Sequence, residues 1–194
     1  MNEKLCLITG GGSGIGRATA IKFAQNKINT IIVGRRNDAL EETVSLADEN
    51  SDFLKPVKAD LSTENGINDL FNYVKKNFDS NVNILVNNAG SSSKIRSVAH
   101  IPKNQWDEVV NINLNSVYLL CQKFLNDMIK NKDGTIITIS SMAALKPGLL
   151  GGAPYGAAKA GVTNLMGAIN SEFSNDGIRA TAIMPGEVDT PILN

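Results

Sequence analysis

Tyr155 and Lys159 stand four residues apart, and two serines, Ser140 and Ser141, precede them along the chain. Residues four apart share one face of a helix, so this spacing predicts a phenol beside an ammonium group. A neighbouring positive charge favours the phenolate and lowers the pKa of the tyrosine. A free phenol ionises near pH ~10, and lowering its pKa to about 7 takes roughly 4 kcal/mol. The spacing therefore predicts that Tyr155 is a general acid/base with Lys159 beside it.

A glycine-rich segment, residues 9–16, follows the apolar residues 5–8. A strand, a turn and a helix in this order form an anion site, because unpaired N–H groups and the positive end of the helix point at the turn. Gly10, Gly14 and Gly16 can adopt positive φ and let the backbone approach a pyrophosphate closely. On its own, the motif is also compatible with a plain tight turn, a methyltransferase or a flavoprotein.

The elements that must position these residues follow an alternating pattern. Short β-rich runs alternate with longer helical patterns, which predicts an α/β fold with a doubly wound parallel sheet, Rossmann-like and in three layers. The expected strands cover roughly residues 4–9, 30–34, 54–58, 82–87, 134–140 and 178–184. The first expected helix begins near Gly14. The other four cover roughly residues 38–49, 63–77, 112–130 and 155–174. Residues 1–194 are expected to form a single domain.

Two of the expected helices carry apolar stripes. Around 112–130 the stripe contains Leu114, Val117, Tyr118, Cys121, Leu125 and Met128. Around 155–174 it contains Ala158, Val162, Leu165, Met166, Ile169 and Phe173. Such a stripe is buried either against the sheet or against a second subunit, and the sequence leaves these alternatives open. A homo-oligomer through these helices is the expectation.

Composition excludes several classes of partner. The chain has 194 residues, and 19 Lys and Arg balance 19 Asp and Glu, so no overall field attracts nucleic acid or an anionic membrane. Apolar runs are far shorter than the ~20 residues of a spanning helix, and no signal-peptide core is evident. A cytoplasmic location is the expectation. Cys6 and Cys121 are predicted to be buried free thiols and His100 a surface residue, so no metal site is predicted.

Taken together, the motifs resemble those of the classical short-chain dehydrogenase/reductase family over Leu5 to Asn194. Segment 9–16 matches the family pattern T-G-x-x-x-G-x-G, and segment 87–90 matches N-N-A-G. The other matches are Asp60-Leu61 after the third strand, the catalytic Ser141, Tyr155 and Lys159, and Pro185, Gly186 and Thr190 in P-G-x-x-x-T. Agreement across all five motifs is very hard to obtain by chance.

The resemblance implies an enzyme that transfers a hydride between a nicotinamide and a ketone or secondary alcohol. Tyr155 would exchange the proton, its pKa lowered by Lys159 together with a cationic nicotinamide. Ser141 would bind the substrate oxygen, and Lys159 would also bind the nicotinamide ribose. A fourth catalytic residue falls on Asn113, with Asn111 as the competitor, and would hold a water molecule. The cofactor-binding residues implied are Gly10, Gly12, Ser13, Gly14, Ile15, Gly16, Arg35, Arg36, Asp60, Leu61, Asn87, Ala89, Gly90, Tyr155, Lys159, Pro185, Gly186, Val188 and Thr190.

The end of the second expected strand indicates which nicotinamide is used. An aspartate there would bind the ribose diol and repel a 2′-phosphate, but Gly34 occupies the position and Arg35 and Arg36 follow. A guanidinium can make charge-assisted hydrogen bonds to a phosphate, so NADP(H) is favoured over NAD(H). The alternative is that both arginines stack on adenine or face solvent.

The chain also departs from the family pattern, because it stops at Asn194, before the segment that covers the substrate. We therefore expect an incomplete, poorly soluble or weakly active polypeptide, and a catalytically silent dinucleotide-binding protein is the alternative function. The substrate is not determined by the motifs. Apolar residues in the loop 142–154 suggest a hydrophobic ketone or alcohol; they are Leu145, Pro147, Leu149 and Leu150.

Overall fold

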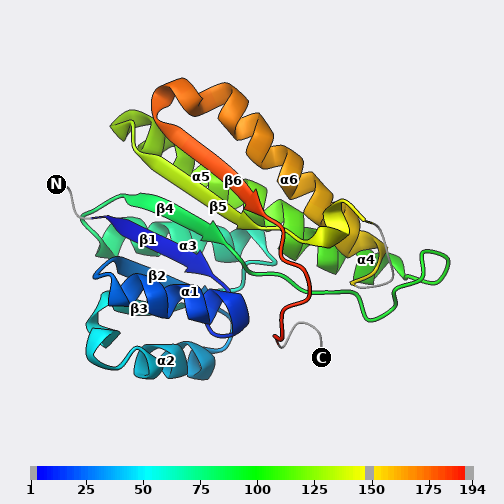
Figure 1. Ribbon diagram of the computed structural model, residues 1–194, viewed down its shortest axis with the longest axis horizontal. Helices are drawn as coiled ribbons and strands as arrows, with labels where there is room; N and C mark the ends of the chain where they lie inside the picture. The colour runs from blue at the N-terminus through cyan, green and yellow to red at the C-terminus, as the bar shows by residue number, and fades with distance from the viewer. Residues whose placement is uncertain (1–3, 147–150, 191–194) are drawn as a thin grey trace.

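A six-stranded parallel sheet forms the centre of the protein in the computed structural model, which describes residues 4–146 and 151–190 (Figure 1). The strands are β1 (Leu5–Thr9), β2 (Asn29–Gly34), β3 (Leu54–Lys58), β4 (Val82–Asn87), β5 (Gly134–Ile139) and β6 (Ile178–Ile183). Their order is β3-β2-β1-β4-β5-β6, so the direction of winding reverses between β1 and β4. Ligands of such sheets bind at this reversal, outside the carboxyl ends of the strands.

Helices cover both faces of the sheet. They are α1 (Gly14–Gln25), α2 (Asn37–Leu46), α3 (Glu64–Asn77), α4 (Lys103–Val110), α5 (Ser116–Asn131) and α6 (Ala153–Phe173). Side chains of α1 and α2 pack on one face, and side chains of α3, α5 and α6 pack on the other. Shorter helices lie at Asp48–Phe53, Asn111–Asn115, Met142–Ala144 and Ser174–Asp176. The predicted doubly wound, Rossmann-like α/β fold is confirmed.

Alternation along the strands explains why the sheet is buried on both sides. Leu7 is completely buried and packs toward α3, α5 and α6, whereas the next residue, Ile8, is completely buried among side chains of α1 and α2. Successive side chains of a strand point to opposite faces, so a strand covered on both faces must be apolar at every position. The continuous apolar runs in the sequence are the result.

The helix boundaries differ from the prediction in two places. The helix expected over 38–49 ends at Leu46 and is followed by a 3-10 helix. The helix expected over 112–130 is preceded by α4, and one π-helical turn at Asn111–Asn115 joins the two. Within residues 4–146 and 151–190, no helix combines the length and apolar character needed to cross a membrane.

Most of both apolar stripes belongs to the core of this chain. Val117, Cys121 and Met128 on α5 are buried in the same cluster as Val162 and others on α6, so the stripes face the sheet. Tyr118 is the exception, with 47% of its surface exposed. Any contact between subunits through α5 and α6 would therefore use their outer faces.

The two cysteines are buried, as predicted, and burial raises the pKa of Cys121 to about 12 and that of Cys6 further. A thiol with so high a pKa is not a nucleophile at neutral pH. His100 is exposed, also as predicted.

Candidate active site

Two neighbouring cavities open at the carboxyl ends of the strands. The larger, of about 820 Å³, lies over the ends of β1, β4, β5 and β6, and the smaller, of about 490 Å³, lies over the ends of β2 and β3. Gly10, Ser13, Ala89 and Gly90 line both, so the cavities adjoin at the place where the strand order reverses. The position is the one expected for a ligand of a doubly wound sheet.

The glycine-rich turn connects β1 to α1 and forms part of the cavity wall. Gly10 and Gly14 adopt φ of +67° and +51°, a region that favours glycine. Gly16 has a different role, because a β-carbon there would collide with the carbonyl oxygen of Gly10 and with Asn88 Nδ2. The turn thus combines left-handed backbone with close packing of α1 on the strand, which leaves the N-terminus of α1 open to the cavity.

Thr9 and Asn88 tie the end of β1 to the end of β4. Thr9 is 1% exposed, and its Oγ1 accepts hydrogen bonds from the backbone N–H groups of Asn88 and Ala89, both at 2.9 Å. Asn88 Nδ2 in turn donates to the carbonyl oxygens of Thr9, at 2.9 Å, and Gly10, at 3.2 Å. Neither Thr9 nor Asn88 is among the predicted site residues, although both lie within the motifs T-G-x-x-x-G-x-G and N-N-A-G.

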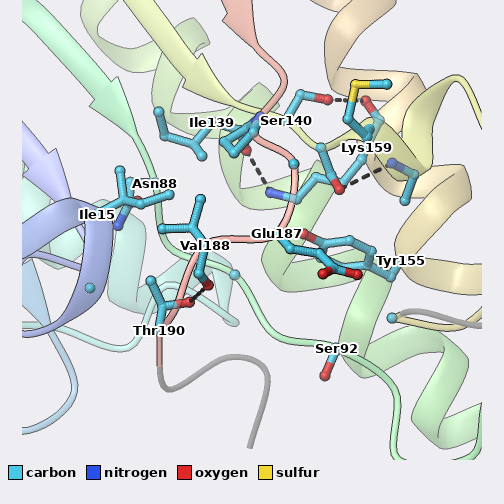
Figure 2. Close-up of a pocket in the computed structure, with 18 of the residues that line it drawn as sticks. Ile15, Asn88, Ser92, Ile139, Ser140, Tyr155, Lys159, Glu187, Val188 and Thr190 are labelled. Carbon is cyan, nitrogen blue, oxygen red and sulfur yellow. Dashed lines mark hydrogen bonds between the residues drawn. The ribbon is translucent and has the colours of Figure 1, made fainter.

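Tyr155 and Lys159 lie on α6 and line the larger cavity (Figure 2). Lys159 is 4% exposed, and its Nζ donates to the carbonyl oxygen of Ile139 at 2.7 Å. The same Nζ lies 5.5 Å from the centroid of the Tyr155 ring. Ser140 Oγ donates to the Lys159 carbonyl oxygen at 2.9 Å, so this serine attaches β5 to α6. Ser141, which follows it, lines the cavity and begins the 3-10 helix Met142–Ala144.

The pKa values of these groups differ from the expectation. Burial raises the pKa of Tyr155, and a hydrogen bond with Ser141 opposes the rise. Burial lowers the pKa of Lys159 to about 8. Desolvation disfavours the charged form of both groups, the phenolate of Tyr155 and the ammonium group of Lys159. In this structure Tyr155 is therefore protonated at neutral pH.

Asn113 lies directly behind Gly90, in the π-helical turn. It is fully buried, and its Nδ2 donates to the carbonyl oxygens of Ser91, at 2.8 Å, and Val109, at 2.9 Å. Its Oδ1 accepts no hydrogen bond from the described residues. A β-carbon on Gly90 would lie 2.5 Å from Asn113 Oδ1 and 3.6 Å from Lys159 Nζ, so glycine keeps the space between them open.

Asn111, the competing asparagine, is exposed, and its Oδ1 accepts a hydrogen bond from Asn115 Nδ2 at 2.7 Å. Its Oδ1 therefore has a partner on the exposed surface of the helix. The geometry favours Asn113 as the asparagine that faces Lys159 across Gly90.

Arg35, Arg36, Asp60 and Leu61 line the smaller cavity together with Gly12. Both arginines are exposed, and neither forms an ion pair within residues 4–146 and 151–190. Hydrogen bonds from the Ser62 hydroxyl and backbone N–H hold the pKa of Asp60 below its usual value, with a smaller contribution from Arg35. Two cationic side chains thus border this cavity outside ion-pair distance of the acids among the described residues, and Asp60 and Glu108 line the cavity with them.

The structure brings most of the predicted site residues to the two cavities. Ser13, Gly14, Ile15, Ala89, Gly90, Pro185, Gly186, Val188 and Thr190 line the larger one. Gly16 and Asn113 are not lining residues but are in contact with residues that are. Asn87 lines neither cavity. Its Nδ2 donates to Thr138 Oγ1 on β5, at 3.4 Å, and to Cys121 Sγ on α5. Leu145 is described and exposed, whereas Pro147, Leu149 and Leu150 lie outside the described residues.

An extended anionic nucleotide fits this arrangement. The N-terminus of α1 and the glycine turn provide N–H groups for a pyrophosphate, while the arginines at the smaller cavity provide positive charge at one end. At the other end Tyr155, Ser141 and Lys159 provide a proton donor, a hydroxyl group and an amine around a single space.

Several known proteins are similar to this chain in fold and in sequence. The family described as short chain dehydrogenase matches residues 4–194. A 3-oxoacyl-(acyl-carrier-protein) reductase of Thermotoga maritima is 32% identical over 192 residues, which are 99% of this chain and 77% of the relative.

Solved structures of similar fold also include short-chain dehydrogenases and reductases. A 3-ketoacyl-(acyl-carrier-protein) reductase from Brucella melitensis complexed with NADH matches with a TM-score of 0.90 and 30% identity, over 98% of this chain and 78% of that chain. A short-chain dehydrogenase from Sphingobium yanoikuyae in complex with NADPH matches with a TM-score of 0.89 and 26% identity, over 97% of this chain and 73% of that chain. These similar proteins include one bound to NADH and one bound to NADPH.

Proposed function

This chain belongs to the short-chain dehydrogenase family of NAD(P)-dependent oxidoreductases acting on ketones or secondary alcohols, and we propose that Ser141, Tyr155 and Lys159 move the proton in its reaction. The observation that carries this proposal is their convergence on one cavity, with the glycine turn on its opposite side. A nicotinamide cofactor, when bound, supplies or accepts the hydride. The remaining chemistry belongs to the side chains.

Ser141 and Tyr155 act on the substrate oxygen. The Ser141 hydroxyl donates a hydrogen bond that orients and polarises the carbonyl group. Tyr155, protonated because burial raises its pKa, then donates its proton to that oxygen. This protonation state favours carbonyl reduction at neutral pH, since alcohol oxidation requires the tyrosine to begin as a base.

Lys159 and Asn113 assist the proton transfer by supplying a proton to Tyr155. Lys159 has a pKa of about 8, so it can take up and release a proton near neutral pH. Asn113 Oδ1, buried and without a hydrogen-bond donor among the described residues, faces the same space beside Gly90. We assign to this oxygen the binding of a water molecule that returns a proton to Lys159 and so to Tyr155.

Tyr155→Phe tests the catalytic assignment. The substitution removes the transferable proton and little volume, so kcat for a panel of ketones should fall about 10²- to 10⁴-fold while nucleotide affinity changes little. Tyr73→Phe is the matched control, because Tyr73 is exposed on α3 and lines neither cavity. Undiminished turnover by Tyr155→Phe would refute the assignment. Nucleotide binding by the parent chain without turnover across the panel would favour a silent dinucleotide-binding protein instead.

For the cofactor we propose a preference for NADP(H) over NAD(H). The support is the pair Arg35 and Arg36, which have no carboxylate partner in the described part of the chain, and the glycine at position 34. A phosphate on the ribose would meet two guanidinium groups at the end of β2, where Gly34 stands in place of an acid that would repel it.

Gly34→Asp tests this preference directly. A β-carbon at Gly34 would lie 3.4 Å from Leu40 Cδ2, an ordinary contact, so the aspartate fits without strain. Its charge should repel the 2′-phosphate and lower the affinity ratio of NADPH to NADH about 10²-fold. Arg35→Met should lower the same ratio. Arg179→Met is the control and should not change it, because Arg179 is an exposed residue of β6 that lines neither cavity. Tighter binding of NADH by the parent chain would overturn the proposal.

We also propose a homo-oligomer through the outer faces of α4, α5 and α6, and a cytoplasmic location. The support for the first is the exposure of Trp106 (38%) and Tyr118 (47%) on neighbouring helices. Light scattering on the purified chain tests it: a monomer at all concentrations contradicts the proposal. Fractionation of the producing cells tests the location.

A further inference from the structure

Charged side chains line the larger cavity beyond the residues that move the proton. They are Arg96 on the loop after β4, Lys146 after β5, and Glu187 after β6. All three are exposed and line the cavity in which a substrate would lie. Figure 2 shows Glu187, Val188 and Thr190 on the segment after β6, with Tyr155 and Lys159 on α6.

The loop that carries Arg96 is held by hydrogen bonds. Gln105 Oε1, at the start of α4, accepts from Ser93 Oγ at 2.7 Å and from the Ile95 N–H at 2.8 Å. The Ser93 N–H donates to the carbonyl oxygen of Gly151 at 3.0 Å. The loop is therefore fixed to α4 on one side and to the residues just before α6 on the other.

These contacts place Arg96 beside the beginning of α6. A β-carbon on Gly152 would lie 3.2 Å from Arg96 Cα, and Tyr155 follows Gly152 by three residues. Arg96 therefore lines the larger cavity near the start of α6, whereas Arg35 and Arg36 line the smaller cavity.

Lys146 belongs to the same short segment as Ser141. Its N–H donates to the carbonyl oxygen of Met142 at 2.9 Å, and the Met142 N–H donates to that of Pro185 at 3.1 Å. The segment after β5 is therefore attached to the segment after β6. Arg96 and Lys146 thus line one cavity from two separate elements, as the binding of one anion by both side chains requires.

Within residues 4–146 and 151–190, neither Arg96 nor Lys146 has a carboxylate partner within ion-pair distance. Glu187 is the one acidic residue among those described that line the cavity. Two cations and one acid leave this wall with an excess of positive charge, and the acid repels an anion placed next to it. An anionic group is therefore attracted toward Arg96 and Lys146 and kept away from Glu187.

We propose that the substrate is a ketone or secondary alcohol that carries an anionic group, a carboxylate or a phosphate, which Arg96 and Lys146 bind while its oxygen lies at Ser141 and Tyr155. Glu187 sets the orientation by repulsion. This inference rests on the proposed function, since it places the reacting oxygen at Tyr155.

Matched pairs of substrates test the inference. Straight-chain oxo acids are compared with their methyl esters, and dihydroxyacetone phosphate with dihydroxyacetone, by kcat/KM in the reduction direction. The first pair detects carboxylate binding and the second phosphate binding. We expect the anionic member of at least one pair to be favoured about tenfold or more, the effect of one or two charge-assisted hydrogen bonds.

Three variants test whether these charged side chains cause the preference for the anionic substrate. Arg96→Met should lower the ratio of anionic to neutral kcat/KM about tenfold or more, and Glu187→Gln should raise it. Lys94→Met is the matched control, because Lys94 is exposed two residues before Arg96 but lines neither cavity, so the ratio should not change. Nucleotide affinity, measured by fluorescence quenching, verifies that each variant is folded.

The outcomes separate the two proposals. Turnover of neutral ketones as good as that of their anionic partners overturns the inference and leaves the proposed function intact. A ratio that Arg96→Met and Lys94→Met change equally also overturns it, since a general charge effect would then explain it. Absence of turnover for both members of every pair, with nucleotide bound, counts against the proposed function itself and against the inference with it.

Discussion

Replacing Lys159 by Met should make the stability of the protein depend less on pH. Lys159 is 4% exposed, and burial lowers its pKa from 10.5 to about 8. The folded protein binds this proton less readily than the unfolded chain does, so stability rises as the pH increases between about 8 and 10.5. At about 1.36 kcal/mol per pKa unit, keeping Lys159 charged at neutral pH costs about 3 kcal/mol.

The assay is urea unfolding of the parent chain and of Lys159→Met at about pH 7 and about pH 10. The variant also loses the 2.7 Å hydrogen bond to the Ile139 carbonyl, which shifts its stability by a similar amount at both pH values. Comparing the difference between the two proteins at the two pH values removes that offset. We expect the parent chain to gain about 2 to 3 kcal/mol relative to the variant between about pH 7 and about pH 10.

Lys76→Met is the control for loss of a positive charge. Lys76 is exposed on α3, and a side chain that stays in water on folding carries no desolvation cost. This variant should follow the parent chain across the pH range. If Lys159→Met also follows the parent chain, the amine is not desolvated in the folded protein, and the argument that it can exchange a proton near neutral pH fails.

Two other predictions concern Tyr155 and Thr9. Because burial holds the pKa of Tyr155 above its ordinary value of 10.0, the rate of ketone reduction should stay high up to about pH 10 and alcohol oxidation should still be rising there; a reduction rate that falls between about pH 6 and 7 contradicts this. Thr9→Val should lower the free energy of unfolding by about 1 to 3 kcal/mol in urea titrations and weaken nucleotide binding, because two partly buried N–H groups lose their 2.9 Å acceptor. Thr9→Ser retains the hydroxyl group and should recover most of both; equal effects of Val and Ser would show that the hydroxyl is not what matters.

Local pattern was sufficient for much of this protein. Strands covered on both faces require uninterrupted apolar runs, so all six strands could be placed within about a residue or two of their observed bounds. The glycines at positions 10 and 14 are at the positive φ that the turn requires, a property of the backbone that depends on few neighbours. Tyr155 and Lys159 share one cavity because helical spacing places them on one face.

Other features depend on contacts between segments distant in the chain. The pKa of Tyr155 is raised where the spacing alone predicted a lower value, because burial depends on what packs around α6 and not on its sequence. Asn87 and Asn88 are adjacent and identical in type, yet Asn87 points beneath α5 while Asn88 holds the turn after β1. Only the pairing of β1 with β4 decides which of the two faces the cavity.

The sequence by itself therefore determined the six strands, five of the six longer helices and the glycine turn, because each follows from periodicity or from the properties of a residue type. The tertiary structure alone decided which charges meet at the cavity. Arg96, Lys146 and Glu187 come from loops after three different strands and belong to no local pattern. They lie around one space because parallel strands end at the same edge of a sheet, which brings together loops that are far apart in the chain.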